Sequence, residues 1–230
     1  MIRTGRLVPE RPYSLGLTAA RYARFPEVVD RFDGTEYRRF LPLGRSGALL
    51  SVRQEGTPAR AVLAWSLEGP AADAPETTSL ARRILEVALG AAQPVRAFYR
   101  ALGRDPVIGQ AIRDFPGLRG AGVPSLWEAL VTAILAQQVN LRFAYDIRRE
   151  LAETFGRRGR FGGTTWFGFP EPRSFSDETR RSMRRFRLSD SKARAILGLA
   201  EGFASGALDE PAIAALGDEE AIERLISFRG

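Results

Sequence analysis

The sequence predicts an α+β protein in which a small N-terminal antiparallel β-sheet domain is followed by an all-α domain. Three observations lead to this prediction. The first 70 residues contain short runs of β-branched, aromatic and leucine residues, separated by glycine-containing turn signals. After residue 79, apolar residues recur at helical spacing behind residues that favour helix starts. The stretch "GPAADAPETT" at 69–78 is typical of a linker, so we expect domains at residues 1–72 and 73–230.

The expected sheet is formed by three segments of the first domain. In the last of them, Ala61, Leu63, Trp65 and Leu67 alternate with smaller or more polar residues, which is the period of a strand with one buried face. A short helix is expected over residues 15–24, before the strands. The strand segments are "GTEYRRFLPL" at 34–43, "GALLSVRQ" at 47–54 and "ARAVLAWSLEG" at 59–69.

The helical part is expected to begin at Ser79, and most of its helices start at a residue with a capping side chain or at proline. In the last helix, Ile222, Leu225 and Ile226 recur at helical spacing and are expected to form its buried side. The expected starts are Ser79, Pro94, Ser125, Asn140, Ser189, Asp209 and Asp218, with stops near Leu89, Leu102, Gly156 and Gly206.

The best-defined helix pair surrounds the segment "QQVN". "SLWE" predicts a capping box, in which Ser125 is the N-cap and Glu128 reaches back to it. Asn140 favours the start of the next helix, so Gln137, Gln138, Val139 and Asn140 lie at a junction of two helices. These residues form either a solvated helix end or a polar tip that meets a partner with hydrogen-bonding edges.

The composition excludes several kinds of chemistry. The chain has no cysteine and no histidine, which removes disulfides, thiolate catalysis, iron–sulfur clusters, the common zinc ligand sets and histidine bases. We therefore expect no metal and no cofactor. No run is long and apolar enough for a membrane span or a signal peptide, so we expect a cytoplasmic protein without membrane contact.

The net charge of +7 is concentrated in one segment. Residues 157–187 hold nine arginines and three acidic residues, a net charge of +6. Four aromatic residues lie among these arginines, as in surfaces that contact phosphates. A solvated charged face beside a small aromatic core would give the same pattern. The aromatic residues are Phe161, Trp166, Phe167 and Phe169.

The order of these motifs resembles the bacterial inducible 3-methyladenine DNA glycosylases, of the helix-hairpin-helix glycosylase superfamily. Four segments carry the resemblance, which spans nearly the whole chain. They are "PYSLGLTAAR" at 12–21, "EALVTAILAQQVNLRFAYDIRRELAETFG" at 128–156, "FPEP" at 169–172 and "LSDSKARAILGLAEGFASGAL" at 188–208. The resemblance implies that the all-α domain is of the helix-hairpin-helix glycosylase type.

The implied activity is excision of alkylated purines, of the 3-methyladenine and 7-methylguanine class, after the base is flipped out of duplex DNA. The resemblance implies that a monomer binds DNA through Gln137–Asn140, with Gln138 at the position usually inserted into the duplex. It also implies that Leu17 lines the base pocket, at a position that is aromatic in better-known members.

The final "LISFRG" supplies Leu225, Phe228 and Gly230 of the hairpin motif, and Gly230 is expected to contact a DNA phosphate. The resemblance places the catalytic aspartate beyond Gly230. We therefore expect a helical domain that is incomplete at its C-terminus, with no catalytic residue within the 230 and no base release by them alone. Asp190 and Asp209 lie at helix starts, where capping is the better interpretation.

Two other classes of function stay open at this point. A non-catalytic DNA-binding or damage-sensing protein would keep the basic surface and would not need the aspartate. A protein-interaction module would use the sheet and the arginines for acidic partners. A steep salt dependence of duplex binding would exclude the interaction module, because phosphate contacts release counterions.

Overall fold

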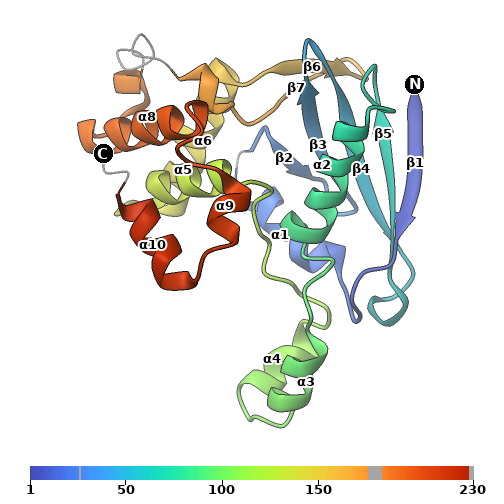
Figure 1. Cartoon of the computed structure of the whole chain (residues 1–230). Coiled ribbons are helices and arrows are strands. Elements are labelled where there is room, and N and C mark those ends of the chain that lie inside the picture. Colours follow the sequence, from blue (N-terminus) through green and yellow to red (C-terminus); the bar gives the residue numbers. More distant parts are fainter. Residues whose placement is uncertain (26, 176–182, 228–230) are drawn as a thin grey trace. The chain divides into compact units, whose positions relative to one another are not determined.

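A computed structural model of the protein describes residues 1–25, 27–175 and 183–227 (Figure 1). Contacts divide the chain into two compact units. Unit 1 comprises Met1–Pro124 and Arg158–Gly168, and unit 2 comprises Ser125–Arg157 and Phe169–Gly230. The units combine a β-sheet with helices, as the α+β fold class predicts. The domain boundary at residues 72 and 73 stays a prediction.

Unit 1 is built on a five-stranded antiparallel sheet in the order β1-β5-β4-β3-β2 (Figure 1). The three predicted strand segments are confirmed as β3, β4 and β5. Two short flanking strands, β1 and β2, were not expected from the sequence. The strands are β1 (Ile2–Leu7), β2 (Asp30–Phe32), β3 (Glu36–Leu43), β4 (Ser46–Glu55) and β5 (Val62–Glu68).

Helices α1 (Leu15–Arg24) and α2 (Pro75–Arg83) supply residues to the core on one face of this sheet. Side chains from β3, β4 and β5 pack there with apolar residues of α2 and of the π-helical turn that follows it, Ile84–Ala88. The expected alternation in β5 is confirmed, because Leu63 and Leu67 are buried in this core.

The helix expected to start at Ser79 begins four residues earlier, at Pro75. Proline is favoured at the first position of a helix because its ring fixes φ near the helical value. The N–H that proline lacks would have no partner within the helix at this position. Ser79 therefore lies inside α2. The segment expected to be a linker also contains buried side chains, including Ala72 and Thr77.

A hairpin from the arginine-rich segment belongs to unit 1. It consists of β6 (Arg158–Phe161) and β7 (Thr164–Phe167). Its Phe161 and Trp166 pack with Phe40 of β3 and Leu49 of β4, a directly paired couple of residues. Because successive residues of a strand face opposite sides, this small core lies on the other face of the sheet from Leu41 and Leu50.

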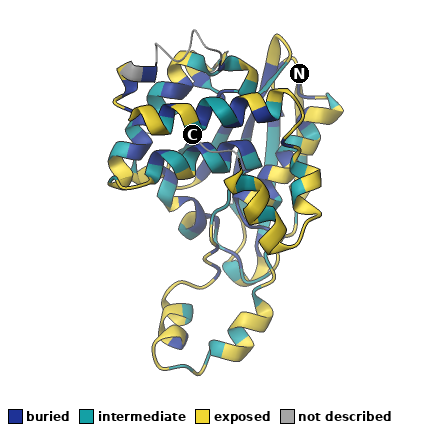
Figure 2. Ribbon diagram, turned by 60° about the vertical axis from the view of Figure 1, so that its left-hand side comes forward, coloured by how far each residue is buried: buried dark blue, intermediate teal, exposed yellow. Residues whose placement is uncertain are grey.

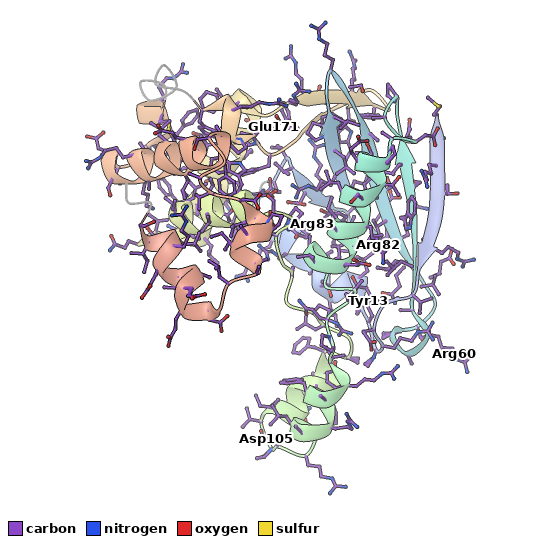
Figure 3. All side chains as sticks on the ribbon, in the orientation of Figure 1. Tyr13, Arg60, Arg82, Arg83, Asp105 and Glu171 are labelled. Atoms are coloured by element: carbon purple, nitrogen blue, oxygen red, sulfur yellow. The ribbon has the colours of Figure 1, made fainter. Side chains whose placement is uncertain are left out.

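The remaining part of unit 1 contains a short 3-10 turn, η1, two helices and an irregular segment that returns to the core. The elements are η1 (Pro58–Arg60), α3 (Arg96–Leu102) and α4 (Ile108–Asp114). In the returning segment, Arg119 donates hydrogen bonds to the carbonyl oxygens of Glu10 and Pro12, both at 2.6 Å. Tyr13 is buried and donates to the carbonyl oxygen of Leu89 at 2.9 Å (labelled in Figure 3). These bonds fix the chain before α1.

Unit 2 is helical. Helix α5 packs against α6 and α8, the 3-10 turn η3 packs against α8, and the 3-10 turn η4 packs against α6. The capping residues predicted at Ser125, Asn140, Ser189 and Asp209 are confirmed, since each side chain accepts a hydrogen bond from a backbone N–H in the first turn. The elements are α5 (Leu126–Ala136), α6 (Leu141–Phe155), η3 (Pro172–Ser174), η4 (Arg184–Phe186), α8 (Asp190–Ala204), α9 (Glu210–Ala214) and α10 (Asp218–Ile226).

The last helix differs from its prediction. Ile222 and Ile226, expected on a buried side of α10, are each 56% exposed, and Leu225 is half-buried. Figure 2 shows α10 mainly in the colour of exposed residues. The prediction of a buried side is wrong because no described element of unit 2 covers these residues. Within the described ranges, no helix is long and apolar enough to cross a membrane.

Candidate nucleic-acid interface

The predicted junction of two helices is confirmed between α5 and α6. Helix α5 ends at Ala136, and Gln137 leaves it in an extended conformation with φ −62° and ψ 129°. Asn140 starts α6 by accepting a hydrogen bond from the N–H of Phe143 at 2.9 Å. Gln137, Gln138 and Asn140 are exposed, and Val139 is half-buried. The structure thus brings the four predicted residues together at one exposed turn.

Gln138 has an unusual backbone conformation, with φ of 56°. Together with the angles of Gln137, this value matches a type II turn, whose third residue is usually glycine or asparagine. A left-handed conformation costs a residue with a side chain about 1 kcal/mol or more. Such strain persists only where surrounding contacts determine the backbone, and it is concentrated at functional sites.

Helices α5 and α6 are joined by a buried ion pair. Arg148 Nη2 donates to Glu128 Oε1 at 2.5 Å, and the two side chains are 5% and 4% exposed. The guanidinium of Arg148 also lies over the ring of Phe169, at 5.2 Å from its centroid. The predicted bond from the Glu128 side chain back to Ser125 stays a prediction, and the pairing of Glu128 with Arg148 is a role that sequence reasoning missed. This pair fixes the two helices that carry the junction.

Aromatic side chains form the core that supports α5. Trp127 donates from Nε1 to the carbonyl oxygen of Pro170 at 2.8 Å, in the "FPEP" segment. Its ring meets Phe175 and Phe203 in edge-on contacts, at centroid distances of 5.5 and 5.8 Å. Phe175 in turn contacts Phe155, near the end of α6. Trp127 therefore contacts two of the matched segments, "FPEP" through Pro170 and the segment at 188–208 through Phe203.

Lys192, in the first turn of α8, also holds the junction. Its Nζ donates to the carbonyl oxygens of Leu135 and Gln137, at 3.1 and 2.7 Å. Burial lowers the pKa of this ammonium below its ordinary value. Sequence reasoning missed this role of Lys192, which is the single lysine in the sequence. A signal was present, because it lies in the matched segment "LSDSKARAILGLA".

The other two predicted site residues, Leu17 and Gly230, belong to other segments of the chain. Leu17 is half-buried in the first turn of α1, which belongs to unit 1, and its N–H donates to the capping Ser14 Oγ. Its assignment to a base pocket stays a prediction. Gly230, expected to contact a phosphate, and Phe228 of the same motif lie outside the described residues.

The arginine-rich segment is divided between the two units. Arg158 and Arg160 are exposed on β6, in unit 1. In unit 2, Arg157 and Arg173 both pair with Glu171 (labelled in Figure 3), and Arg187 pairs with Glu150 at 2.8 Å. Three of the four interleaved aromatic residues, Phe161, Trp166 and Phe169, are packed against other side chains, which favours the small-core interpretation for these rings. Arg180 and Arg181 lie outside the described residues.

The carboxylates near helix starts have structural roles. Asp209 caps α9 by accepting from the N–H of Ala212 at 3.0 Å, and Asp190 is the first residue of α8, after the capping Ser189. An acidic residue in the first turn is stabilised by the helix dipole. Among the residues that the structure describes, no group of three or more acidic side chains could hold a metal ion.

The chain is similar in sequence to a DNA glycosylase. It is 32% identical over 133 residues to the DNA-3-methyladenine glycosylase of Bacillus subtilis, a match that covers 58% of this chain and 44% of that protein. The chain thus matches less than half the length of this curated relative. No family model matches the chain.

Solved structures give a wider match. The 3-methyladenine DNA-glycosylase of Archaeoglobus fulgidus has a TM-score of 0.79 and 23% identity, over 98% of this chain and 75% of that one. The chain has a DNA glycosylase fold. The 8-oxoguanine glycosylase/lyase of Clostridium acetobutylicum, bound to double-stranded DNA, has a TM-score of 0.69 and 13% identity, over 98% and 73% of the two chains. The predicted resemblance to 3-methyladenine DNA glycosylases is confirmed by the Bacillus and Archaeoglobus matches.

Proposed function

We propose that this protein is a base-excision repair glycosylase that hydrolyses the N-glycosidic bond of alkylated purines in duplex DNA. In this proposal, residues 1–230 bind the DNA and help to extrude the damaged base. The observation that carries it is the exposed turn at Gln137–Asn140, where strained backbone holds a polar side chain at the tip of two rigidly joined helices. Sequence similarity to a DNA-3-methyladenine glycosylase supports the choice of alkylated purines.

The turn suits the task of base extrusion. A glycosylase must separate a nucleotide from its stack, at a cost of a few kcal/mol, and a side chain that fills the vacated space recovers part of that cost. Gln138 offers an amide that can donate and accept hydrogen bonds with the orphaned base on the opposite strand. The half-buried Val139 beside it adds apolar contact.

Hydrolysis of an N-alkylated purine makes modest chemical demands. The base already carries a positive charge and leaves readily, so a carboxylate that stabilises positive charge on the sugar and orients a water is sufficient. Neither a metal nor a cofactor is needed for this mechanism. The proposal assigns no catalytic role to Asp190 or Asp209, because both have structural roles at helix starts.

The alternative is a non-catalytic DNA-binding or damage-sensing protein, which the same turn would serve. Base release separates the two functions. The native protein, isolated from its own cells, should release 3-methyladenine and 7-methylguanine from methylated duplex DNA, measured by chromatography of the free bases. Tight binding to methylated DNA without any release would favour the damage sensor. Equal binding to heparin and to DNA would overturn both.

A further inference from the structure

Lys192 connects the start of α8 to the turn between α5 and α6. Its Nζ donates to two carbonyl oxygens, of Leu135 at 3.1 Å and of Gln137 at 2.7 Å. Leu135 belongs to the last turn of α5, where carbonyl groups have no partner within the helix. The Gln137 carbonyl belongs to the peptide that joins Gln137 to Gln138. The second bond therefore acts on the orientation of that peptide.

The orientation of this peptide determines the conformation of Gln138. Type I and type II turns differ by a flip of their central peptide, and only type II needs a positive φ at its third residue. Glutamine by itself favours the type I form, with negative φ. The structure has the other form, with Gln137 ψ at 129° and Gln138 φ at 56°. A donor on the Gln137 carbonyl favours the form that is observed.

Lysine suits this position better than arginine. Its ammonium is a compact donor with three N–H groups on a flexible stem, whereas a guanidinium is a planar fork suited to paired acceptors. Lys192 is the single lysine in a chain whose other 33 basic residues are arginine. The start of α8 is fixed as well, because Ser189 caps it and Ala193 and Ile196 are buried.

We propose that Lys192 is a positioning residue that holds Gln138 in its left-handed conformation and so keeps the α5–α6 turn ready for insertion into DNA. The role in DNA recognition rests on the proposed function, while the effect on the turn does not. If the competent turn falls to about a tenth of the population without Lys192, affinity for a lesion that requires insertion falls about tenfold.

The test uses Lys192→Met, which keeps the stem and removes the donor. The control is Arg194→Met, which removes one positive charge from an exposed residue of the same helix. Affinity is measured at one salt concentration for a duplex with an abasic-site analogue and for the same duplex undamaged. We expect the preference of Lys192→Met for the abasic duplex to fall about tenfold relative to Arg194→Met. Lys192→Arg should retain part of it, because it can still donate to a carbonyl.

Crystal structures of the same variants test the effect of Lys192 on the turn separately from the role of the turn in DNA recognition. We expect Gln138 to have negative φ in Lys192→Met and positive φ in Arg194→Met. Positive φ retained in Lys192→Met, or a lesion preference equal to that of Arg194→Met, overturns the proposal. If the unmodified chain has no preference for the abasic duplex, the proposed function fails, and the φ of Gln138 still decides the role of Lys192. If Lys192→Met does not fold, the comparison is made with Lys192→Gln, whose shorter amide does not place a charged donor at both carbonyls.

Discussion

At the scale of single residues, Asp33 shows how one side chain fixes a turn. Its Oδ1 accepts hydrogen bonds from the N–H groups of Thr35 and Glu36, at 3.0 and 2.8 Å, and from Thr35 Oγ1 at 2.9 Å. These bonds close the connection between β2 and β3, at Gly34 with φ of 100°. Backbone donors favour the charged carboxylate and lower the pKa of Asp33 to about 2.

The first prediction concerns this carboxylate. Asp33→Ala should lower the free energy of unfolding at pH 7 by about 1 kcal/mol, because hydrogen bonds to a turn are lost. A lowered pKa in the folded state means that the stabilisation is complete above the ordinary value of 3.8 and is lost as pH falls toward 2. Urea unfolding across this range should therefore show the two proteins converging. A difference that is constant with pH would contradict the assignment, and the exposed Asp73→Ala serves as control.

At the scale of elements, the buried pair of Glu128 and Arg148 joins α5 to α6. Removal of one partner takes the ion pair away from a charge that stays buried, which usually costs about 3–5 kcal/mol. Arg148→Met should therefore strongly lower the denaturant midpoint. The double variant Glu128→Leu/Arg148→Met should recover a large part of the loss, because an apolar pair needs no charge partner. A cost below about 1 kcal/mol for Arg148→Met would show that the pair does not hold the helices together.

Elements also show what the sequence could and could not predict. The start of α6 was predictable because Asn140 caps it locally, through an atom three residues from its donor. The β6–β7 hairpin was missed because its strands are four residues long, and its two-glycine turn lies among arginines that suggest a solvated loop. Its burial depends on Phe40 and Leu49, more than 100 residues away in the chain. Local patterns carry no information on such contacts.

In the candidate site, too, local features could be predicted from the sequence and features that depend on distant contacts could not. Capping signals placed Gln137–Asn140 at a junction, whereas the left-handed conformation of Gln138 and its support by Lys192 depend on contacts between distant segments. The prediction of a buried side on α10 was wrong for a similar reason. Helical spacing predicts which residues share a face, and only neighbouring elements decide whether that face is buried.

At the scale of the whole molecule, the net charge of +7 predicts salt-dependent DNA binding. Each neutralised phosphate contributes about −0.9 to the slope of log affinity against log salt, so three or four contacts give a slope of about −3. Arg158 and Arg160 are exposed on β6. The double variant Arg158→Ala/Arg160→Ala should make the slope less steep by about 0.9 for each phosphate contact that is lost, for one or two contacts. Fluorescence anisotropy with a labelled duplex measures this slope.

A matched control removes two charges elsewhere in unit 1. Arg60→Ala/Arg82→Ala changes the net charge equally, at side chains that Figure 3 labels on η1 and α2. If both double variants change the slope equally, β6 makes no specific phosphate contact. An unmodified protein with a flat titration would contradict DNA binding through phosphates altogether.

The central claim is that the α5–α6 turn recognises damaged DNA through Gln138. The most direct measurement is the ratio of affinities for an abasic-analogue duplex and an undamaged duplex, for the unmodified chain and for Gln138→Ala, at one salt concentration. We predict that the unmodified chain prefers the abasic duplex and that Gln138→Ala loses most of this preference while it retains its affinity for undamaged DNA. Gln110→Ala, on the exposed surface of α4, should keep the preference. An unchanged ratio in Gln138→Ala would contradict the account.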